Sequence, residues 1–414
     1  MSETIAPPRA QTTAAPTVTK RKVSAAPSLA PAPQVGLSPA YLLGTGVHIP
    51  QDVITNAELV ESFNAWVKAE TVRCMATGAE PPKASSEPFI VKASGIEQRH
   101  VLSKDGILDP ERMMPRFPER ANDELSIQAE FAVASAGKAL AAAGVAPHEI
   151  DMVICSCAHH QRPYPALAVE VQQALGTSGA AFDMNVACSA TTFAMHMATG
   201  LVRSGAARKV LVVSPEIMSG HLNWRDRQTH FIFGDASAAA VIGSEPGRGA
   251  GAGGQHATFE IVDTRTWTQF SSNIRSNFGF LNRTHDERGE EGIEHADRLV
   301  TQQGQKVFRE VTAAVDVFLT KFLADHGLKA DGLRRYWLHQ ANLRLNLAVM
   351  NKLLGAEPSE DLTPHILHKY GNVAAPGSLI AFHENHADFE AGEEGVICSF
   401  GAGYSIGALL LRRV

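Results

Sequence analysis

Residues 182–200, FDMNVACSATTFAMHMATG, indicate the fold class because two residue patterns meet at one cysteine. The run before Cys188, AAFDMNVA, is mostly apolar and predicts a buried strand over residues 180–187. The residues after it, SATTFAMHMATGLVRSG, predict a helix that ends at Gly205. Cys188 is therefore expected at a strand-to-helix turn, near the first turn of the helix.

The same alternation continues on both sides of this stretch. Predicted strands are AYLLGTGVHIP (40–50), DMVICSCA (151–158) and RKVLVVSPE (208–216). Predicted helices are TNAELVESFNAWVKA (55–69), ELSIQAEFAVASAGKALAAAG (124–144) and ALAVEVQQALG (166–176). Thr55 with Glu58 has the spacing of a capping box, and Gly144 is a stop signal. Strands that alternate with helices predict an α/β protein with a mainly parallel sheet.

A faint internal repeat divides the chain. GVAPHEIDMVICSC (144–157) and GLKADGLRRYWLHQ (327–340) both read as a helix end, a loop and an apolar strand. We therefore expect two similar halves, residues 39–220 and 255–414, with a connecting segment over 221–254. Residues 1–38 are rich in Ala and Pro and are expected to be a disordered tail, because they cannot bury enough apolar surface.

Composition excludes several classes of protein. The 414 residues carry a formal net charge of −6, which argues against a nucleic-acid partner. No apolar run reaches the roughly eighteen residues of a membrane span. The five cysteines are odd in number and irregular in spacing, which argues against a disulfide framework and for a reducing compartment. We expect a cytoplasmic protein.

Cys188 is the first candidate for chemistry. Unpaired N–H groups and the dipole at a helix start favour an anion, so we expect a lowered thiol pKa and a nucleophilic sulfur. The alternative is a buried structural cysteine, since free cysteine often behaves as a small apolar residue.

A thiolate nucleophile needs polar partners, and two residues have suitable positions. His339 ends the apolar run RRYWLH, and Asn372 lies in the Gly- and Ala-rich turn GNVAAPG. Ligands of open α/β sheets bind at the carboxyl ends of strands, where both are expected. A Cys–His–Asn set also occurs in cysteine proteases, but their Cys/Trp-rich signature near the N-terminus is absent here.

Five motifs then carry a family resemblance: NVACSATTF, FIFGDASAAAVI, LHQANLRLN, KYGNVAAPGS and SFGAGYSIGALLL. In this order they resemble β-ketoacyl-acyl-carrier-protein synthase III, a condensing enzyme, over residues 42–413. The resemblance implies an α/β thiolase-like fold, with two pseudo-symmetric βαβ halves in a five-layered core, and a homodimer.

The resemblance also implies roles for residues. Cys188 would take an acyl group from acyl-CoA, and His339 with Asn372 would promote decarboxylation of a malonyl thioester. The backbone N–H groups of Cys188 and Ala402 would form an oxyanion hole. No cofactor or metal is implied, and we interpret CSCAHH (155–160) as a strand end, not a metal site.

Further matches concern substrates. Positions that line the tunnel for coenzyme A and the primer are Arg227, Gly304, Phe308, Asn342 and Tyr164, the last reaching the partner subunit. Positions that dock the acidic acyl carrier protein are Arg309, Arg344 and Lys352.

Two departures concern how coenzyme A is held. The family's adenine-binding Trp and Arg are replaced by Phe89 and Ala93, with Lys92 adjacent. The segment from Asn56 to Phe89 is also roughly twenty residues longer than usual, a length typical of a functional lid or a disordered insert.

The resemblance predicts condensation of an acyl-CoA primer with malonyl-acyl carrier protein, giving 3-oxoacyl-acyl carrier protein and initiating fatty-acid synthesis. The wording of several motifs resembles a branch that uses medium-chain primers. Alternatives are condensation or acyl transfer in polyketide- or quinolone-type metabolism, a Cys–His–Asn thioester hydrolase, and a non-catalytic module that binds a carrier protein.

Overall fold

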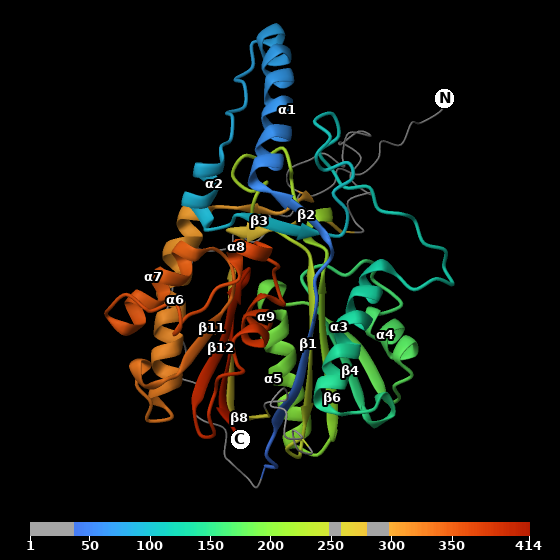
Figure 1. Ribbon diagram of the computed structural model, residues 1–414, viewed down its shortest axis with the longest axis vertical. Helices are drawn as coiled ribbons and strands as arrows, with labels where there is room; N and C mark the ends of the chain where they lie inside the picture. Colours follow the sequence, from blue (N-terminus) through green and yellow to red (C-terminus); the bar gives the residue numbers. More distant parts are fainter. Residues whose placement is uncertain (1–36, 248–257, 280–297) are drawn as a thin grey trace, which may run out of the picture. The chain divides into compact units, whose positions relative to one another are not determined.

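The computed structural model describes residues 37–247, 258–279 and 298–414. The expected tail, residues 1–38, lies outside the described residues except at its last two positions. Gln34–Val414 form one compact unit. Its elements follow the predicted alternation of strands and helices, so the α/β class is confirmed (Figure 1).

Nine strands form one sheet in the order β11-β12-β13-β8-β1-β7-β6-β4-β5. The strands from the first part of the chain are β1 (Tyr41–His48), β4 (Met152–Ser156), β5 (Ala180–Met184), β6 (Lys209–Glu216) and β7 (Ala236–Gly243). Those from the second part are β8 (Phe259–Ser271), β11 (Arg335–Leu338), β12 (Glu394–Gly401) and β13 (Gly403–Arg413).

The two parts repeat one strand pattern. In the first, β4 pairs parallel with β6, and β6–β7 and β7–β1 are antiparallel. In the second, β11 pairs parallel with β12, and β12–β13 and β13–β8 are antiparallel. A short antiparallel contact between β1 and β8, Tyr41 with Glu260 and Leu42 with Phe259, joins the halves. The internal repeat seen in the sequence therefore corresponds to a repeat of topology.

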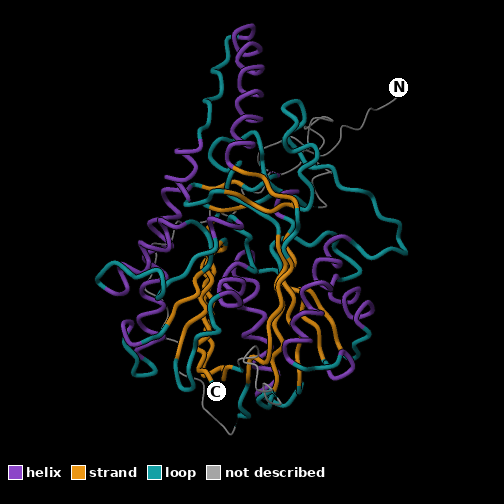
Figure 2. The backbone as a smooth tube through the Cα atoms, in the orientation of Figure 1, coloured by secondary structure: helices purple, strands orange, loops and turns teal. Residues whose placement is uncertain are grey.

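Helices and sheet halves alternate in five layers (Figures 1 and 2). Between the sheet halves lie α5 (Ala190–Arg203) and α9 (Gly377–Glu384). The outer layers are α3 (Ile127–Ala143) with α4 (Leu167–Leu175), and α6 (Gly304–Ala324) with α7 (Leu343–Leu354). Separate apolar clusters fill the central layer and each outer layer. This arrangement is the five-layered core that the family resemblance implies.

Local sequence signals explain how α3 is placed. Ser126 accepts a hydrogen bond from the Ala129 N–H at the start of the helix, and Gly144 ends it with a φ of 62°. Gly44 and Gly46 of β1 let the helix approach closely, because a Cβ at either position would lie within 2.5 Å of the α3 backbone. The central strand and its covering helix are thereby fixed to each other.

The end of the core that holds the site is covered by a separate group of elements. These are β2 (Asp52–Thr55), α1 (Asn56–Thr77), α2 (Glu87–Ser94) and β3 (Gln98–Val101), with the short β9 (Ile274–Arg275), β10 (Thr301–Gln302) and α8 (Leu367–Tyr370) nearby. The predicted capping box of Thr55 and Glu58 is confirmed. The helix extends beyond the predicted residue 69 to Thr77, so much of the long segment 56–89 is helical and projects from the molecule (Figure 1).

Three expectations differ from the structure. The strand over 180–187 was expected to be buried, but β5 covers Ala180–Met184 and is half-exposed, because it is the last strand of the sheet. The sheet was expected to be mainly parallel, but its described strand pairings are parallel only for β11–β12, β4–β6 and β4–β5, and the others are antiparallel. The segment 221–254 contains β7, which is fully buried and pairs with both β1 and β6.

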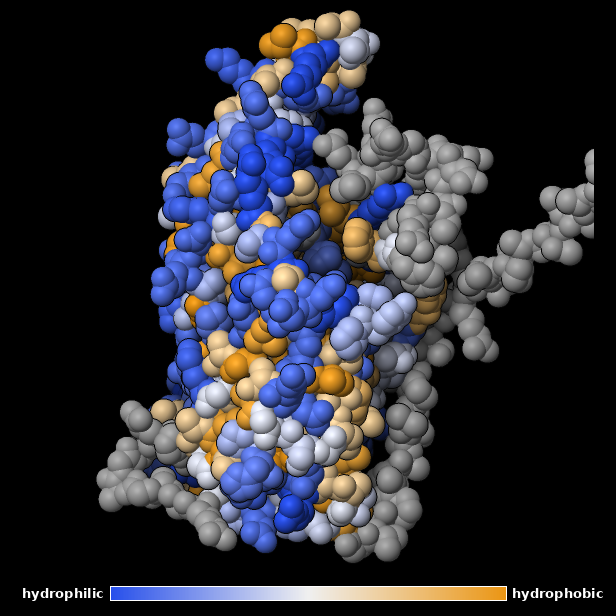
Figure 3. Space-filling view, turned by 90° about the vertical axis from the view of Figure 1, so that its right-hand side faces the viewer, coloured by the Kyte–Doolittle hydropathy of each residue, from blue (hydrophilic) through white to orange (hydrophobic). Residues whose placement is uncertain are grey.

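Among the described residues, no helix combines the length and the apolar character that a membrane crossing requires. The face turned toward the viewer in Figure 3 is mostly hydrophilic in its upper part and mixes apolar with polar side chains in its lower part.

Candidate active site

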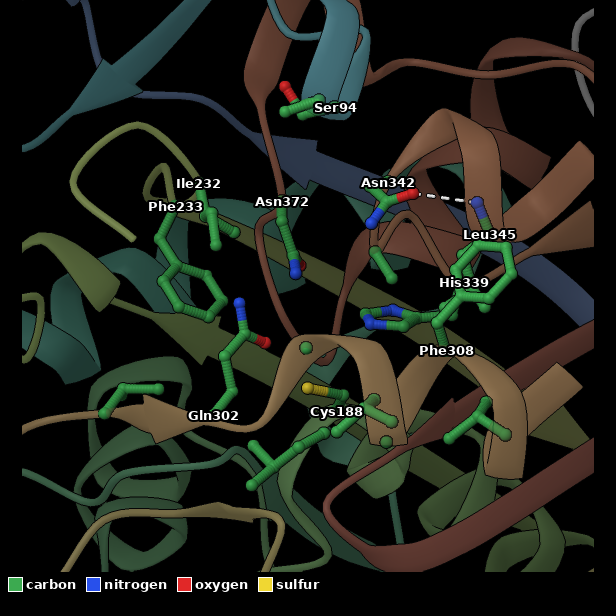
Figure 4. A pocket seen from close by; sticks show the side chains of 18 of the residues that line it. Ser94, Cys188, Ile232, Phe233, Gln302, Phe308, His339, Asn342, Leu345 and Asn372 are labelled. Atoms are coloured by element: carbon green, nitrogen blue, oxygen red, sulfur yellow. Dashed lines mark hydrogen bonds between the residues drawn. The ribbon is translucent and has the colours of Figure 1, made fainter. Parts of the chain in front are cut away.

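Cys188, His339 and Asn372 line one cavity of about 250 Å³. They come from different parts of the chain: the turn before α5, the residue after β11 and the turn before α9. The imidazole of His339 and the carboxamide of Asn372 lie on the same side of the cavity, facing the Cys188 sulfur (Figure 4). The three residues singled out in the sequence are therefore brought together.

Cys188 lies in a tight turn. A 3₁₀ turn over Ala187–Ser189 connects β5 to α5, as the sequence predicted. Ala187 has a φ of +46°, a conformation that non-glycine residues rarely adopt and that is often found at functional sites. The turn presents the sulfur to the cavity.

The expected lowering of the Cys188 pKa is wrong. Burial raises the pKa of the thiol to about 12, with a further contribution from the carboxylate of Glu216. The backbone N–H groups of Ala402 and Cys188 oppose this rise, but they do not outweigh it. The physical reason is that removing a thiolate from water costs more than two N–H donors return. The resting side chain is a thiol.

His339 is positioned by the sheet. It directly follows β11, and its N–H donates to the carbonyl of Cys398 at 2.7 Å. Its ring meets that of Phe400 edge-on, with centroids 5.4 Å apart. Burial lowers the pKa of His339 to about 3, so the imidazole is neutral at physiological pH. Its Nδ1 atom is buried and has no hydrogen-bond partner among the described residues.

Asn372 is held by its backbone and by one side-chain oxygen. Its N–H donates to the carbonyl of Ile232 at 2.9 Å, and its own carbonyl accepts from Gly234 at 3.0 Å. Its Oδ1 atom accepts from the Ala374 N–H at 2.9 Å. Because the oxygen of the carboxamide is used in this way, its NH₂ group is left to face the cavity.

Ala402 lies in the link between β12 and β13. The non-glycine residues with positive φ in the described chain are Met113, Ala187 and Ala374, so Ala402 has a conformation that suits alanine. Its N–H faces the Cys188 sulfur and lowers the thiol pKa. An alanine at this position is therefore compatible with a backbone donor there.

The structure places some of the predicted tunnel residues at the cavity and others outside its lining. Gly304, Phe308 and Asn342 line the cavity, as do Phe89 and Ala93. The Oδ1 atom of Asn342 also caps α7, accepting from the Leu345 N–H at 2.8 Å (Figure 4).

Arg227 and Tyr164 are not among the residues that line the cavity. The Arg227 guanidinium lies 3.8 Å from the centre of the Phe89 ring and donates from Nε to the Ala84 carbonyl at 2.6 Å. It therefore contacts Phe89, a residue that lines the cavity. Tyr164 is 82% exposed on this chain.

The three predicted docking residues lie on the two helices that border the cavity. Arg309 is on α6, one residue after Phe308, and Arg344 is on α7, two residues after Asn342. All three are exposed, and Lys352 forms an ion pair with Asp316 at 3.0 Å.

The segment CSCAHH forms a cluster. Ligand atoms of Cys155, Cys157 and His160 lie within 4.8 Å of one another. Gln128 Nε2 lies 3.5 Å from the Cys157 sulfur, and His160 Nε2 lies 3.9 Å from an Asp183 oxygen. Cys157 and His160 therefore each lie near a polar side chain of the protein.

Residues that the sequence analysis did not single out also shape the site. The cavity wall is largely apolar and includes Phe231, Phe233, Val300, Val307 and Phe400. Glu216 was missed as well, although an acid at the end of the apolar strand RKVLVVSPE is an unusual signal.

Comparison with known proteins identifies the family. The model of 3-oxoacyl-[acyl-carrier-protein] synthase III matches residues 182–258, and that of its C-terminal part matches residues 323–413. A β-ketodecanoyl-[acyl-carrier-protein] synthase of Pseudomonas aeruginosa is 48% identical over 358 residues, covering 86% of this chain and 100% of the relative. The chain belongs to the 3-oxoacyl-[acyl-carrier-protein] synthase III family.

More distant synthases of this family share the fold. A β-ketoacyl-[acyl-carrier-protein] synthase III of Chelativorans is 28% identical, covering 89% of this chain and 98% of the relative. The crystal structure of the Aquifex aeolicus synthase III superposes with a TM-score of 0.68 at 23% identity, over 90% of this chain and 99% of that one. The crystal structure of a priming β-ketosynthase of the R1128 polyketide pathway superposes with a TM-score of 0.70 at 25% identity. The match covers 94% of this chain and 99% of that one. The protein is a condensing acyltransferase with a thiolase-like fold.

Proposed function

We propose that this synthase III joins an acyl-CoA primer to malonyl-acyl carrier protein, with loss of carbon dioxide, to give 3-oxoacyl-acyl carrier protein. The observation that carries the proposal is the convergence of Cys188, His339 and Asn372 on one apolar cavity. The chemistry needs one nucleophile and two hydrogen-bond donors, and these side chains can supply them.

In the first step, the Cys188 sulfur attacks the thioester carbonyl of acyl-CoA. Because burial keeps the sulfur protonated at rest, its proton must leave as the bond forms, and it passes to the sulfur of the departing coenzyme A. The N–H groups of Cys188 and Ala402 stabilise the oxyanion. Coenzyme A leaves as a thiol with that proton, and one thioester has replaced another.

In the second step, malonyl-acyl carrier protein loses carbon dioxide and negative charge builds on its thioester oxygen. The NH₂ group of Asn372 can donate to that oxygen. A buried N–H without a partner is rarer than a buried acceptor without one, so the unpaired Nδ1 of His339 favours the tautomer that carries its proton on Nε2. His339 can therefore donate as well. The carbanion attacks the acyl-Cys188 carbonyl, and the released thiolate takes up a proton.

A medium-chain primer is the finer part of the proposal. The P. aeruginosa relative is named for a β-ketodecanoyl product, which has ten carbons. Condensation with a malonyl unit adds two carbons, so a product of that length arises from an eight-carbon primer. We extend this preference to the present chain because the two proteins are 48% identical over 358 residues.

The substrates would enter past Phe89 and the basic helices. The stacked pair of Arg227 and Phe89 offers a flat cationic surface beside the cavity, suited to the adenine of coenzyme A. Arg309 and Arg344 would attract the acidic carrier protein by charge complementarity. Initiation of fatty-acid synthesis is the pathway that we propose.

A homodimer completes the proposal. Within the described sheet, β5 has a strand partner on one side only, and such an edge can pair with a second copy. Tyr164 is 82% exposed and lies three residues before Leu167, whose N–H donates to Asp183 of β5, which is consistent with a role in closing the partner's acyl pocket.

A polyketide-priming role is a second candidate because of the R1128 neighbour, with a TM-score of 0.70 at 25% identity. Condensation assays with an acyl-CoA length series and malonyl-loaded carrier proteins of fatty-acid and polyketide type would test both. We expect 3-oxodecanoyl product and carbon dioxide from octanoyl-CoA with the fatty-acid carrier. Product with the polyketide carrier alone would favour the second role, and free acid without an extended product would overturn both.

A further inference from the structure

Glu216 is a buried acid that the condensation mechanism leaves unused. It is the last residue of β6, and its exposed fraction is 0%. No salt bridge to it is present among the described residues. An isolated carboxylate in such a place is costly unless it is neutral or serves a function.

The contacts of Glu216 connect the two turns that frame the site. Its Oε1 atom accepts a hydrogen bond from the Ala158 N–H, after β4, at 2.7 Å. The N–H of Ala375, three residues after Asn372, also faces the carboxyl group and favours its charged form. The Oε2 atom is buried and makes no well-formed hydrogen bond among the described residues. The carboxyl group of Glu216 thus lies between the Ala158 turn of the first half and the Ala375 turn of the second half.

The surrounding hydroxyl network reaches from Cys188 to the same place. Thr191, three residues after Cys188, donates to Ser214 at 2.8 Å and contacts the Ala375 carbonyl at 2.8 Å. Ser214 is two residues before Glu216 on β6. The nucleophile turn, the end of β6 and the Asn372 turn are therefore linked through a short chain of contacts.

The titratable groups that face Glu216 are Asp235, Cys157 and Cys188. Burial, with the nearby charge of Asp235, raises the pKa of Glu216 to about 8. Burial raises the pKa values of Cys188 and Cys157, and the charge of Glu216 adds to both rises. Near neutral pH the carboxyl group is therefore mostly protonated, and its ionisation above pH 8 places a negative charge beside the sulfur.

We propose that Glu216 is a positioning residue for Cys188, which joins the turns of the two halves and sets the electrostatic environment of the sulfur. When Glu216 is neutral, it does not repel the negative charge that forms on the sulfur during attack and release. As the carboxylate it opposes that charge. The inference deepens the proposed function, but its test needs no substrate.

The test is the pH dependence of Cys188 alkylation by iodoacetamide from pH 6 to 10, located by peptide mass spectrometry. Glu216→Gln keeps the size of the side chain and an oxygen for Ala158 but cannot ionise. We expect equal rates below pH 7 and a rate about threefold or more above that of the unmodified protein at pH 9. Superimposed profiles over the whole range would overturn the proposal.

A matched control is an acid outside β6 that pairs with the first residue of this strand. Glu149 pairs with Lys209 at the opposite end of β6, so Glu149→Gln removes an acid far from the sulfur and should leave the profile unchanged. A second variant, Glu216→Asp, keeps the charge but shortens the link to Ala158. It should lower the alkylation rate at every pH while keeping the original shape of the profile.

The unmodified protein provides a test that does not depend on the folding of variants. A thiol with a high pKa reacts tenfold faster for each pH unit if nothing nearby titrates. Ionisation of Glu216 should flatten this rise between pH 7 and 9. A strict tenfold rise per unit across that range would contradict the proposal, whether or not Cys188 carries out condensation.

Discussion

Gly401 lies so close to Cys188 that a Cβ atom on residue 401 would come within 2.6 Å of the Cys188 Cβ and 3.2 Å of its sulfur. Gly401 is the last residue of β12, in the second half of the chain, and Cys188 lies in the turn before α5, in the first half. The position of the proposed nucleophile is therefore fixed by backbone from the other half. No larger residue fits at 401 unless the turn of Cys188 shifts.

Gly401→Ala should reduce acylation of Cys188 by about tenfold or more, because a displacement of one ångström at a reacting atom is costly. The melting temperature should fall only modestly, since Ala is a small addition. Stopped-flow measurement of coenzyme A release would give the acylation rate. Gly137→Ala is the control: its Cβ would meet nothing within 4 Å in α3, so the activity should stay and stability should rise by about 0.5–1 kcal/mol. Equal acylation by both variants would contradict this account of Gly401.

Asn372→Asp should uncouple the two half-reactions. Aspartate keeps the oxygen that accepts from Ala374 but replaces the NH₂ donor by a second oxygen that repels an enolate. Carbon dioxide release from malonyl-acyl carrier protein should fall by about 10²–10³-fold, while acyl-enzyme formation changes little. Asn351→Asp, at an exposed position of α7, is the control. A variant that loses acylation and decarboxylation to the same extent would argue against a specific role for the Asn372 amide.

Phe89→Ala should weaken binding of coenzyme A. The ring lines the cavity and supports the Arg227 guanidinium at 3.8 Å, so its loss removes an apolar surface and frees the cation. We expect KM for acyl-CoA to rise by about tenfold, because one stacked contact with the nucleotide is lost. The value of kcat should stay nearly unchanged. Acyl-pantetheine, which lacks the nucleotide, should show no such rise. Val91→Ala, at a 43% exposed position of the same helix, should leave both values unchanged.

Buried neutral histidines should make the protein acid-sensitive. Burial lowers the pKa values of His230 and His339 to about 3, and that of His221 to about 4. Below pH 6.5 the unfolded chain binds protons that the folded chain does not, so stability is lost as pH falls from 6.5 toward these values. Each such group contributes on the order of 2 kcal/mol of loss at pH 5 relative to pH 7.5.

Urea unfolding at pH 7.5 and pH 5 measures this loss. His230→Gln should reduce the difference between the two pH values, because it removes one of the buried imidazoles. His148→Gln changes an exposed histidine and should leave the difference as it is. If the His230 variant shows the same loss as the unmodified protein, the assignment of acid sensitivity to this residue fails.

Local signals explain what the sequence could predict. The capping box at Thr55, the stop at Gly144 and the position of Cys188 before a helix depend on neighbouring residues, and the structure confirms all three. His339 at a strand end was predicted in the same way.

Long-range packing explains what could not be predicted. The exposure of β5 depends on its place at the sheet edge, which its apolar sequence does not reveal. The raised pKa of Cys188 depends on burial and on Glu216, a residue 28 positions later. The contact between the Arg227 guanidinium and the Phe89 ring likewise depends on two segments that are distant in the sequence.

Acyl transfer to one sulfur is the central claim, and mass spectrometry of the intact protein after incubation with octanoyl-CoA tests it most directly. The account predicts a single octanoyl adduct that maps to Cys188, is absent in Cys188→Ala, and disappears on addition of malonyl-acyl carrier protein as 3-oxodecanoyl product forms. An adduct that persists in Cys188→Ala, or one that malonyl-acyl carrier protein does not discharge, would contradict it.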